Sequence, residues 1–355
     1  MISKPKIKIL IVDDSALIRQ TLQKVFEHMS DMEVIGTAAD PFIAVQKMKS
    51  DKPDVITLDI QMPRMDGLTF LKKIMSQHPI PVVVISSISQ KDSKVALTAF
   101  NYGAIDVIEK PVLSSDLLHE EWKEKLINAV RTAAHSVVTK QILNTIKKSQ
   151  IIKEIHKPAI KKNRICNSFV LIGSSAGGTE VINTIVSQLD KNTVPLLIVQ
   201  HMPVLFTAAY AERLNNNSEL EIKEASSGDE LQRGIALVSP GDKHMELMNN
   251  GFNFFVSLNS REKVNRHRPS VDVLFNSALS YSGNNILAII LSGMGNDGSA
   301  SMLNLKNAGA ITVAQSKESC IVYGMPKEAV RIGAASHSFS IEEIIQVINN
   351  FSRKH

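Results

Sequence analysis

The sequence predicts two doubly wound α/β domains, each built on a parallel sheet. In both halves of the chain, strand-like apolar runs alternate with helix-like amphipathic stretches, which is typical of parallel sheets with helices on both faces. The length of 355 residues is enough for two domains that each bury a core. The 44% hydrophobic and 21% charged residues are close to a globular average, which excludes a disordered chain.

Five short apolar runs in the first half are expected to form the strands of one sheet. Each run is continuous rather than alternating, as in strands that are buried on both faces. Helical patterns follow the first two runs, at residues 17–25 and 42–48. The expected strands are residues 8–12, 33–38, 55–58, 82–85 and 105–108.

The same alternation returns in the second half and predicts a second parallel sheet. Helical patterns follow the first and last of its clearest strands, at residues 179–189 and 300–307. The expected strands are residues 168–172, 195–200, 235–239 and 285–292.

The net charge of +5 is concentrated in one segment between these halves. Residues 131–165 carry nine basic groups and one acidic group, whereas residues 1–130 and 166–355 have net charges of −1 and −2. We therefore expect domains at 1–125 and 166–355 joined by a basic, partly helical linker at 126–165. The linker is either a solvated connector or a surface for a membrane or an acidic receptor. Because both large blocks are near neutral, no nucleic-acid partner is expected.

Several classes of protein are excluded by simple counts. Two cysteines, Cys166 and Cys320, are too few for a disulfide framework, and no C-x-x-C pair suggests a metal site. No apolar stretch reaches the roughly 18 residues of a spanning helix, and the first apolar run is too short for a signal peptide. We expect a reduced, cytoplasmic protein.

Polar side chains follow four strands of the first predicted sheet. Asp13 and Asp14 end the first strand and Asp59 ends the third, at the sheet edge where ligands of parallel sheets bind. Three carboxylates in one crevice repel one another unless a hard cation such as Mg²⁺ joins them. Ser86 ends the fourth strand and Lys110 the fifth, which adds a hydroxyl and an ammonium. The set predicts a site for phosphoryl transfer, although a single aspartate could instead cap a helix.

Residues 6–125 resemble the receiver domain of response regulators. The resemblance implies a flavodoxin-like fold in which Asp59 is the phospho-acceptor and Asp13, Asp14 and Asp59 bind Mg²⁺. It also implies that Ser86 contacts the phosphoryl group and that Lys110 pairs with it. The matching residues are Asp13-Asp14, Asp59-x-x-Met62-Pro63-x-Met65-Asp66-Gly67, Ser86 and Lys110-Pro111.

A serine, a histidine and an aspartate each follow a strand of the second predicted sheet. Ser175 lies in a G-x-S-x-G nucleophile-elbow pattern, which is also one residue away from a dinucleotide-binding fingerprint. An alcohol needs an adjacent base, so we expect His201 to take the proton from Ser175. Asp297 would then orient the imidazole, and the backbone around Met294 would face a developing oxyanion.

Two other hypotheses remain open from these residues. In an unrelated α/β-hydrolase the chain order is serine, acid, histidine, which would make His337 the base in place of His201. A response regulator without enzymatic activity would instead bind a partner or DNA, with the basic segment 131–165 as its best support.

Residues 166–350 resemble the catalytic domain of the chemotaxis protein-glutamate methylesterases. The resemblance implies a Ser175–His201–Asp297 triad that hydrolyses glutamyl γ-methyl esters of methyl-accepting chemoreceptors and deamidates specific receptor glutamines. It implies a chemotaxis histidine kinase as phosphodonor to Asp59, recruitment to membrane-bound receptor arrays, Mg²⁺ for receiver phosphorylation and no cofactor for ester hydrolysis. The matching stretches are residues 172–178, 200–203, 239–244, 267–272, 293–298 and 323–326.

Overall fold

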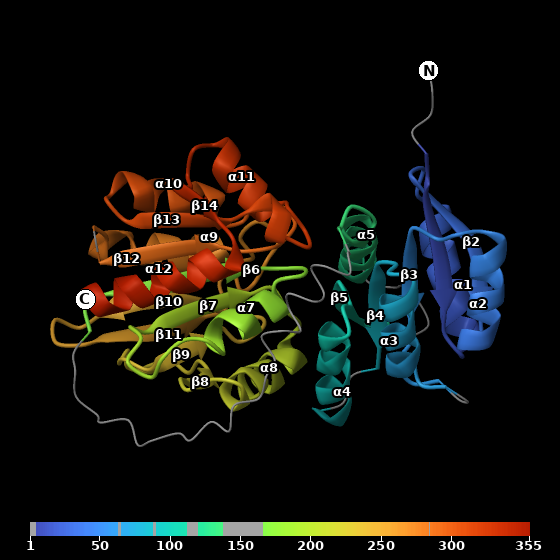
Figure 1. The fold of residues 1–355 in the computed structure, drawn as a ribbon, viewed down its shortest axis with the longest axis horizontal. Coiled ribbons are helices and arrows are strands. Elements are labelled where there is room, and N and C mark those ends of the chain that lie inside the picture. Colours follow the sequence, from blue (N-terminus) through green and yellow to red (C-terminus); the bar gives the residue numbers. More distant parts are fainter. Residues whose placement is uncertain (1–4, 63–64, 88–89, 112–119, 138–165, 284) are drawn as a thin grey trace. The chain divides into compact units, whose positions relative to one another are not determined.

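Figure 1 shows a computed structural model, which describes residues 5–62, 65–87, 90–111, 120–137, 166–283 and 285–355. The chain divides into two compact units, residues 1–143 and residues 144–355. Within the described ranges, no helix is both long and apolar enough to cross a bilayer.

The first unit is built on a parallel five-stranded sheet. Its elements are β1 (Ile7–Val12), α1 (Ala16–Glu27), β2 (Met32–Ala38), α2 (Pro41–Ser50), β3 (Val55–Leu58), α3 (Gly67–Gln77), β4 (Val82–Ser86), α4 (Gln90–Asn101), β5 (Asp106–Glu109) and α5 (Glu120–Ala134). The strand order β2-β1-β3-β4-β5 confirms the predicted flavodoxin-like sheet. Every residue of β3 and β4 is buried, as helices on both faces require. The order reverses between β1 and β3, which places the predicted aspartates at the switch point.

Helix α5 continues past the boundary that the charge pattern suggests. Its residues Leu126, Val130 and Ala133 are buried, and the helix packs against β3, β4 and β5. The predicted boundary between residues 125 and 126 therefore falls inside a packed helix of the first unit. The rest of the predicted linker, from residue 138 to residue 165, lies outside the described residues, and so does Pro63 of the receiver motif.

The second unit is built on a larger parallel sheet of order β14-β13-β12-β6-β7-β9-β8, with a separate antiparallel pair β10–β11. Its elements are β6 (Phe169–Ser174), α7 (Thr179–Val186), β7 (Leu196–Gln200), α8 (Val204–Asn216), β8 (Glu221–Glu224), β9 (Ile235–Val238), β10 (His244–Asn249), β11 (Phe254–Asn259), α9 (Val271–Ser277), β12 (Ile286–Ile290), α10 (Ser299–Asn307), β13 (Ile311–Gln315), α11 (Met325–Arg331), β14 (His337–Phe339) and α12 (Ile341–Lys354). This confirms the predicted doubly wound sheet. The chain winds from β6 to β7 on one side and returns to β12 on the other, so the switch point lies between β6 and β12.

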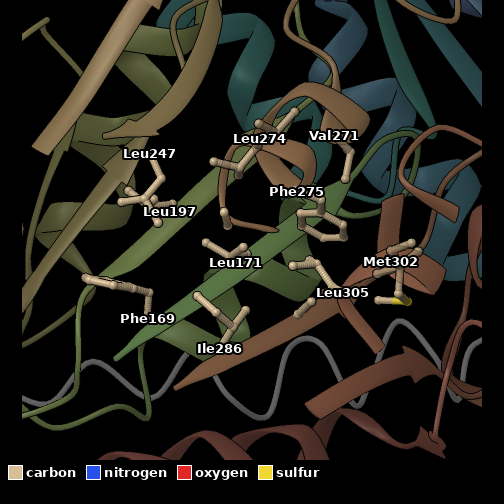
Figure 2. Close-up of a cluster of buried hydrophobic side chains, with 14 of the residues drawn as sticks. Phe169, Leu171, Leu197, Leu247, Val271, Leu274, Phe275, Ile286, Met302 and Leu305 are labelled. Carbon is tan, nitrogen blue, oxygen red and sulfur yellow. The ribbon is translucent and has the colours of Figure 1, made fainter. Parts of the chain in front are cut away.

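The hydrophobic core of the second unit fixes the start of α9 over the sheet (Figure 2). Leu171 of β6 and Leu197 of β7 are fully buried with Phe275 of α9, and each such side chain contributes about 1.5–3 kcal/mol. The approach is closest at Gly173, where an added Cβ would lie 2.3 Å from Val271 Cγ1. A glycine is therefore needed for α9 to reach the carboxyl end of β6.

Candidate functional site

The first unit gathers three carboxylates at the carboxyl ends of β1 and β3. Oxygens of Asp13, Asp14 and Asp59 lie within 4.8 Å of one another. Asp13 and Asp59 are buried, whereas Asp14 is exposed. Lys110, directly after β5, places its Nζ 2.7 Å from Asp59 Oδ2 and 2.9 Å from Asp13 Oδ2. The structure thus brings together all four of these side chains.

This aspartate pocket holds more negative charge than its own residues neutralise. Burial raises the pKa of both Asp13 and Asp59, and the ion pairs with Lys110 offset only part of that rise. Burial lowers the pKa of Lys110, but the two carboxylates outweigh it and the pKa is raised overall. Among the residues that the structure describes, Asp13 Oδ2 finds no hydrogen-bond donor of good geometry despite its ion pair with Lys110. Carboxylate oxygens are the ligands that Mg²⁺ prefers, so the pocket fits such a cation.

Ser86 lies beside the aspartate pocket at the end of β4. Its register partner is Glu109 of β5, and its carbonyl accepts a hydrogen bond from the Lys110 N–H at 2.8 Å. The Ser86 hydroxyl is buried and donates to the Ser87 carbonyl at 3.2 Å. Ser86 is therefore next to Lys110, with its hydroxyl turned toward its own chain.

In the second unit, Ser175, His201 and Asp297 follow three neighbouring strands, β6, β7 and β12. The His201 N–H donates to the Ser174 carbonyl at 3.0 Å, and the Ser175 N–H donates to the Ser292 carbonyl at 3.0 Å. These bonds continue the pairing of β6 with β7 and with β12 one step past the strands. The three predicted residues therefore lie at one edge of the sheet, at its switch point.

The imidazole of His201 is bound to the carboxylate of Asp297 through one nitrogen. His201 Nε2 lies 2.9 Å from Asp297 Oδ2, and both side chains are almost fully buried. Because an ionised carboxylate only accepts, this contact places the imidazole proton on Nε2 and leaves Nδ1 as an acceptor. His201 Nδ1 is buried and has no hydrogen-bond partner in the described ranges, Ser175 included. Catalytic hydrogen bonds of this kind are often open in unliganded sites and tighten when substrate binds.

Asp297 is held by donors that the sequence did not reveal. Asn265 Nδ2 donates to Oδ1 at 2.8 Å, Ser270 Oγ donates to Oδ1 at 2.7 Å, and the Val271 N–H donates to Oδ2 at 2.7 Å. Burial alone would raise the pKa of Asp297, but hydrogen bonds from His201, Asn265 and Ser270 outweigh it and hold the pKa well below its usual range. Asp297 therefore stays a carboxylate that orients the imidazole.

His267 is a second residue of the site that sequence reasoning did not assign. Its ring is stacked on that of His201, with centroids 3.8 Å apart and planes 8° apart. The available signal was the run 267–272, which matched the methylesterase pattern without giving His267 a place in the triad. Asn265 lies outside that run and left no sequence signal.

The backbone around Ser175 can receive a negatively charged oxygen. A Cβ on Gly293 would lie 2.8 Å from Ser175 Cβ, so a glycine there admits the nucleophile. In the ranges that the structure describes, the N–H groups of Ala176 and Gly177 donate to no acceptor of the protein. Met294 follows Gly293, with a side chain that is 40% exposed. The sequence singled out Met294 but not the two N–H groups.

His337, the alternative base, lies far from this edge in the sheet order. It begins the edge strand β14, is exposed, and stacks on Phe339 at 5.1 Å between centroids. Strands β13 and β12 separate β14 from β6, and His337 is at the amino end of its strand. This geometry does not support His337 as the base for Ser175.

Comparison with known proteins identifies relatives of both units. The CheB methylesterase family matches residues 170–348, and the response regulator receiver domain matches residues 9–123. Protein-glutamate methylesterase/protein-glutamine glutaminase 2 of Oleidesulfovibrio alaskensis is 46% identical over 334 residues, which covers 92% of this chain and 93% of the relative. Protein-glutamate methylesterase/protein-glutamine glutaminase 3 of Geobacter metallireducens is 43% identical over 350 residues, which covers 97% and 98%. The crystal structure of the Thermotoga maritima CheB methylesterase catalytic domain is 36% identical with a TM-score of 0.50, covering 52% of this chain and 97% of that one.

Proposed function

The chain belongs to the CheB methylesterase family, with a response regulator receiver domain in its first half, and from this premise we propose its reaction. The protein removes γ-methyl esters from glutamyl residues of chemoreceptors and deamidates receptor glutamines. One observation carries the proposal: the imidazole of His201 is tied to Asp297 through Nε2, which leaves Nδ1 open at the edge where Ser175 lies.

In the proposed reaction Ser175 Oγ attacks the ester carbonyl carbon while His201 Nδ1 accepts its proton. Asp297 stabilises the imidazolium through Nε2–H, and the N–H groups of Ala176 and Gly177 face the developing oxyanion, each donor contributing about 2.7–4 kcal/mol. The C–O bond to methanol then breaks and the leaving oxygen takes the proton from Nδ1. A water molecule attacks the acyl-enzyme in the same way and releases the glutamate carboxylate. For a glutamine the leaving group is ammonia.

The imidazole is used in the opposite sense from the common serine-protease template, in which Nδ1 faces the aspartate and Nε2 faces the serine. Here the chemistry is the same because either ring nitrogen accepts a proton when the other donates. Met294 is proposed to line the substrate beside Ser175, since its side chain is partly exposed directly after Gly293.

The aspartate pocket is proposed to regulate this hydrolysis. Asp59 accepts a phosphoryl group from the chemotaxis histidine kinase, and Lys110 pairs with the phosphoryl oxygens. Asp13, Asp14 and Asp59 would together hold Mg²⁺. Mg²⁺, when bound, neutralises charge on the transferred group. The Ser86 hydroxyl contacts the phosphoryl group after turning from the Ser87 carbonyl. Phosphorylation raises hydrolysis of the receptors, whose membrane-bound arrays are the expected place of action.

Methanol release from methylated receptor membranes tests the proposal. The full chain is compared with Ser175→Ala and Asp59→Ala, each with and without a small-molecule phosphodonor. We expect Ser175→Ala to lose methanol release by roughly 10⁴-fold or more in both conditions. Asp59→Ala is expected to hydrolyse at the basal rate without responding to the phosphodonor. Release by Ser175→Ala at the rate of the parent chain would exclude the proposed nucleophile.

A further inference from the structure

A tight turn at residues 264–267 lies between β11 and α9. It contacts His201 and Asp297, two members of the proposed Ser175–His201–Asp297 relay. Val264 and His267 exchange backbone hydrogen bonds of 3.1 and 2.9 Å. The two central residues, Asn265 and Arg266, have positive φ angles of 51° and 67°. Positive φ at both central residues is what a type I′ turn requires, and asparagine is among the few residues that accept it. Non-glycine residues in this region persist where the surrounding structure holds them, and they cluster at functional sites.

Two residues of this turn, Asn265 and His267, contact different parts of the relay. The His267 ring covers one face of the His201 ring at 3.8 Å, nearly parallel to it. Asn265 Nδ2 donates to Asp297 Oδ1 at 2.8 Å and also to Asp272 Oδ2 at 2.6 Å. Asp272 belongs to α9, where its backbone is fixed by the helix. One turn therefore bridges the base, the orienting carboxylate and the start of α9.

The His201 ring needs such support because its in-plane contacts are one-sided. Its Nε2 is bonded to Asp297, whereas Nδ1 has no hydrogen-bond partner in the described ranges. Rotation about the Cβ–Cγ bond would take Nδ1 away from Ser175, and a flat ring stacked on one face resists that rotation. A small misplacement of a catalytic group lowers the rate without weakening substrate binding.

On the basis of the proposed function, we infer that the turn 264–267 is a positioning element of the relay. His267 holds the plane of the His201 imidazole, and Asn265 holds the carboxylate of Asp297. Both act through another residue, so their loss lowers kcat and leaves KM unchanged. A turn that only connects β11 to α9 would change stability and leave kcat as it is.

The first test replaces His267 in the full chain and measures methanol release. His267→Ala removes the stacked ring, and we expect kcat to fall roughly 2- to 13-fold, the usual 0.5–1.5 kcal/mol of a ring pair converted at 1.36 kcal/mol per tenfold. His267→Phe restores a flat ring without ring nitrogens and is expected to recover most of kcat. His337→Ala is the matched control, because His337 also stacks on a ring but lies outside the site.

The second test replaces Asn265 by glycine, which keeps the positive φ and removes only the amide. Asn265→Gly is expected to lower kcat roughly tenfold, since it removes a hydrogen bond to a charged group, while KM stays unchanged. Thermal unfolding of each variant checks that the fold is retained. If His267→Ala does not fold, His267→Phe and Asn265→Gly still test the inference.

Failure of the inference is distinguishable from failure of the proposed function. Ser175→Ala, measured in parallel, tests the proposed function. Hydrolysis by that variant at the rate of the parent chain would exclude the proposed function. If the parent chain hydrolyses and Ser175→Ala does not, three results overturn the positioning role alone. These are an unchanged kcat in both His267→Ala and Asn265→Gly, a rise in KM with kcat unchanged, and a His267→Phe variant as impaired as His267→Ala.

Discussion

The aspartate pocket of the first unit and the relay of the second lie at equivalent switch points of two parallel sheets. The pKa of a buried carboxylate is nevertheless shifted in opposite directions in the two sites. Asp59 shares a single ammonium with Asp13, and burial raises the pKa of both. Asp297 is buried to a similar degree but receives hydrogen bonds from His201, Asn265 and Ser270, and its pKa is lowered. The number of donors around the carboxylate therefore sets the direction of its pKa shift, and the sheet only sets its place.

This difference matches two kinds of chemistry. A pocket with excess negative charge gains from a cation and from reversible phosphoryl transfer, so its state depends on what is bound. A carboxylate that is already saturated with donors needs no reorganisation when the imidazole becomes charged, as electrostatic preorganisation requires. We expect substitutions in the two sites to differ in both size and sign.

The largest effect is expected from Asp297→Asn. An amide in this place presents an NH₂ group to donors that need an acceptor, and it favours the wrong tautomer of His201. By analogy with the serine-protease triad we expect kcat to fall by roughly 10⁴-fold. Methanol release measures it, with Asp190→Asn as control, since the Asp190 carboxylate accepts a local hydrogen bond from the Asn192 N–H. Activity within tenfold of the parent would show that the donors around Asp297 do not prepare the base.

The second effect is a gain in the stability of the first unit without Mg²⁺, in contrast to the loss of kcat expected in the second unit. Asp13→Asn relieves repulsion with Asp59, so the first unit should be more stable without the cation and lose its response to it. At a hundred times its Kd, Mg²⁺ should stabilise the parent by roughly 2.7 kcal/mol. The single tryptophan, Trp122, lies in α5, so its fluorescence reports unfolding of this unit. Equal stabilisation of parent and variant by Mg²⁺ would contradict the proposed site.

A third effect tests how packing supports the relay. Gly173→Ala places a methyl group against Val271, whose N–H donates to Asp297. Overpacking of this kind costs roughly 1–3 kcal/mol, and we expect lower kcat together with an earlier loss of hydrogen-exchange protection in β6 and α9. Gly36→Ala is the control, because there the added methyl meets only the flexible side chain of Lys47. An unchanged kcat in Gly173→Ala would separate the α9 contact from the relay.

The smallest effect is a pH dependence without Mg²⁺. Because Asp59 and Asp13 have raised pKa values in the folded state, the first unit loses stability as pH rises from their unfolded values through the folded ones. Asp59→Asn should flatten this slope in Trp122-monitored denaturant unfolding between pH 4 and pH 8. Asp297 has a lowered pKa in the folded state. It therefore stabilises the fold at pH values above its unfolded pKa, and this stability is lost only as the pH falls below that pKa. If the free energy of unfolding of Asp59→Asn falls with pH as steeply as that of the parent, the raised pKa of Asp59 is contradicted.

The sequence predicts the sheets and the strand ends because their signals are local. Predicted strands of four to eight residues mark the buried sheets, and polar residues that follow them mark the sites. The predicted helix at 179–189 ends earlier, at Val186, and beyond it the N–H groups of Gln188 and Leu189 donate to carbonyls three residues back. Strands β8, β13 and β14 and the pair β10–β11 were not predicted.

The missing part of the site depends on contacts between distant residues. Asn265 is 32 residues from Asp297, and its role follows from a turn with two positive φ angles that no motif reveals. The choice of ring nitrogen in His201 likewise depends on how Asp297 is held. Residue types at strand ends predicted which groups lie at one edge of the sheet, and three-dimensional packing determined how His201 and Asp297 face one another.

The most direct test of the central claim is the tautomer of His201, measured by ¹⁵N NMR on full-length protein with labelled histidine. The His201 signals are assigned by their absence in His201→Gln, and the spectrum is recorded above the ordinary titration range of imidazole. We predict a protonated Nε2 hydrogen-bonded to Asp297 and an unprotonated Nδ1 available to Ser175. A proton on Nδ1 would contradict this prediction, because the base would then have no free acceptor for the serine hydroxyl.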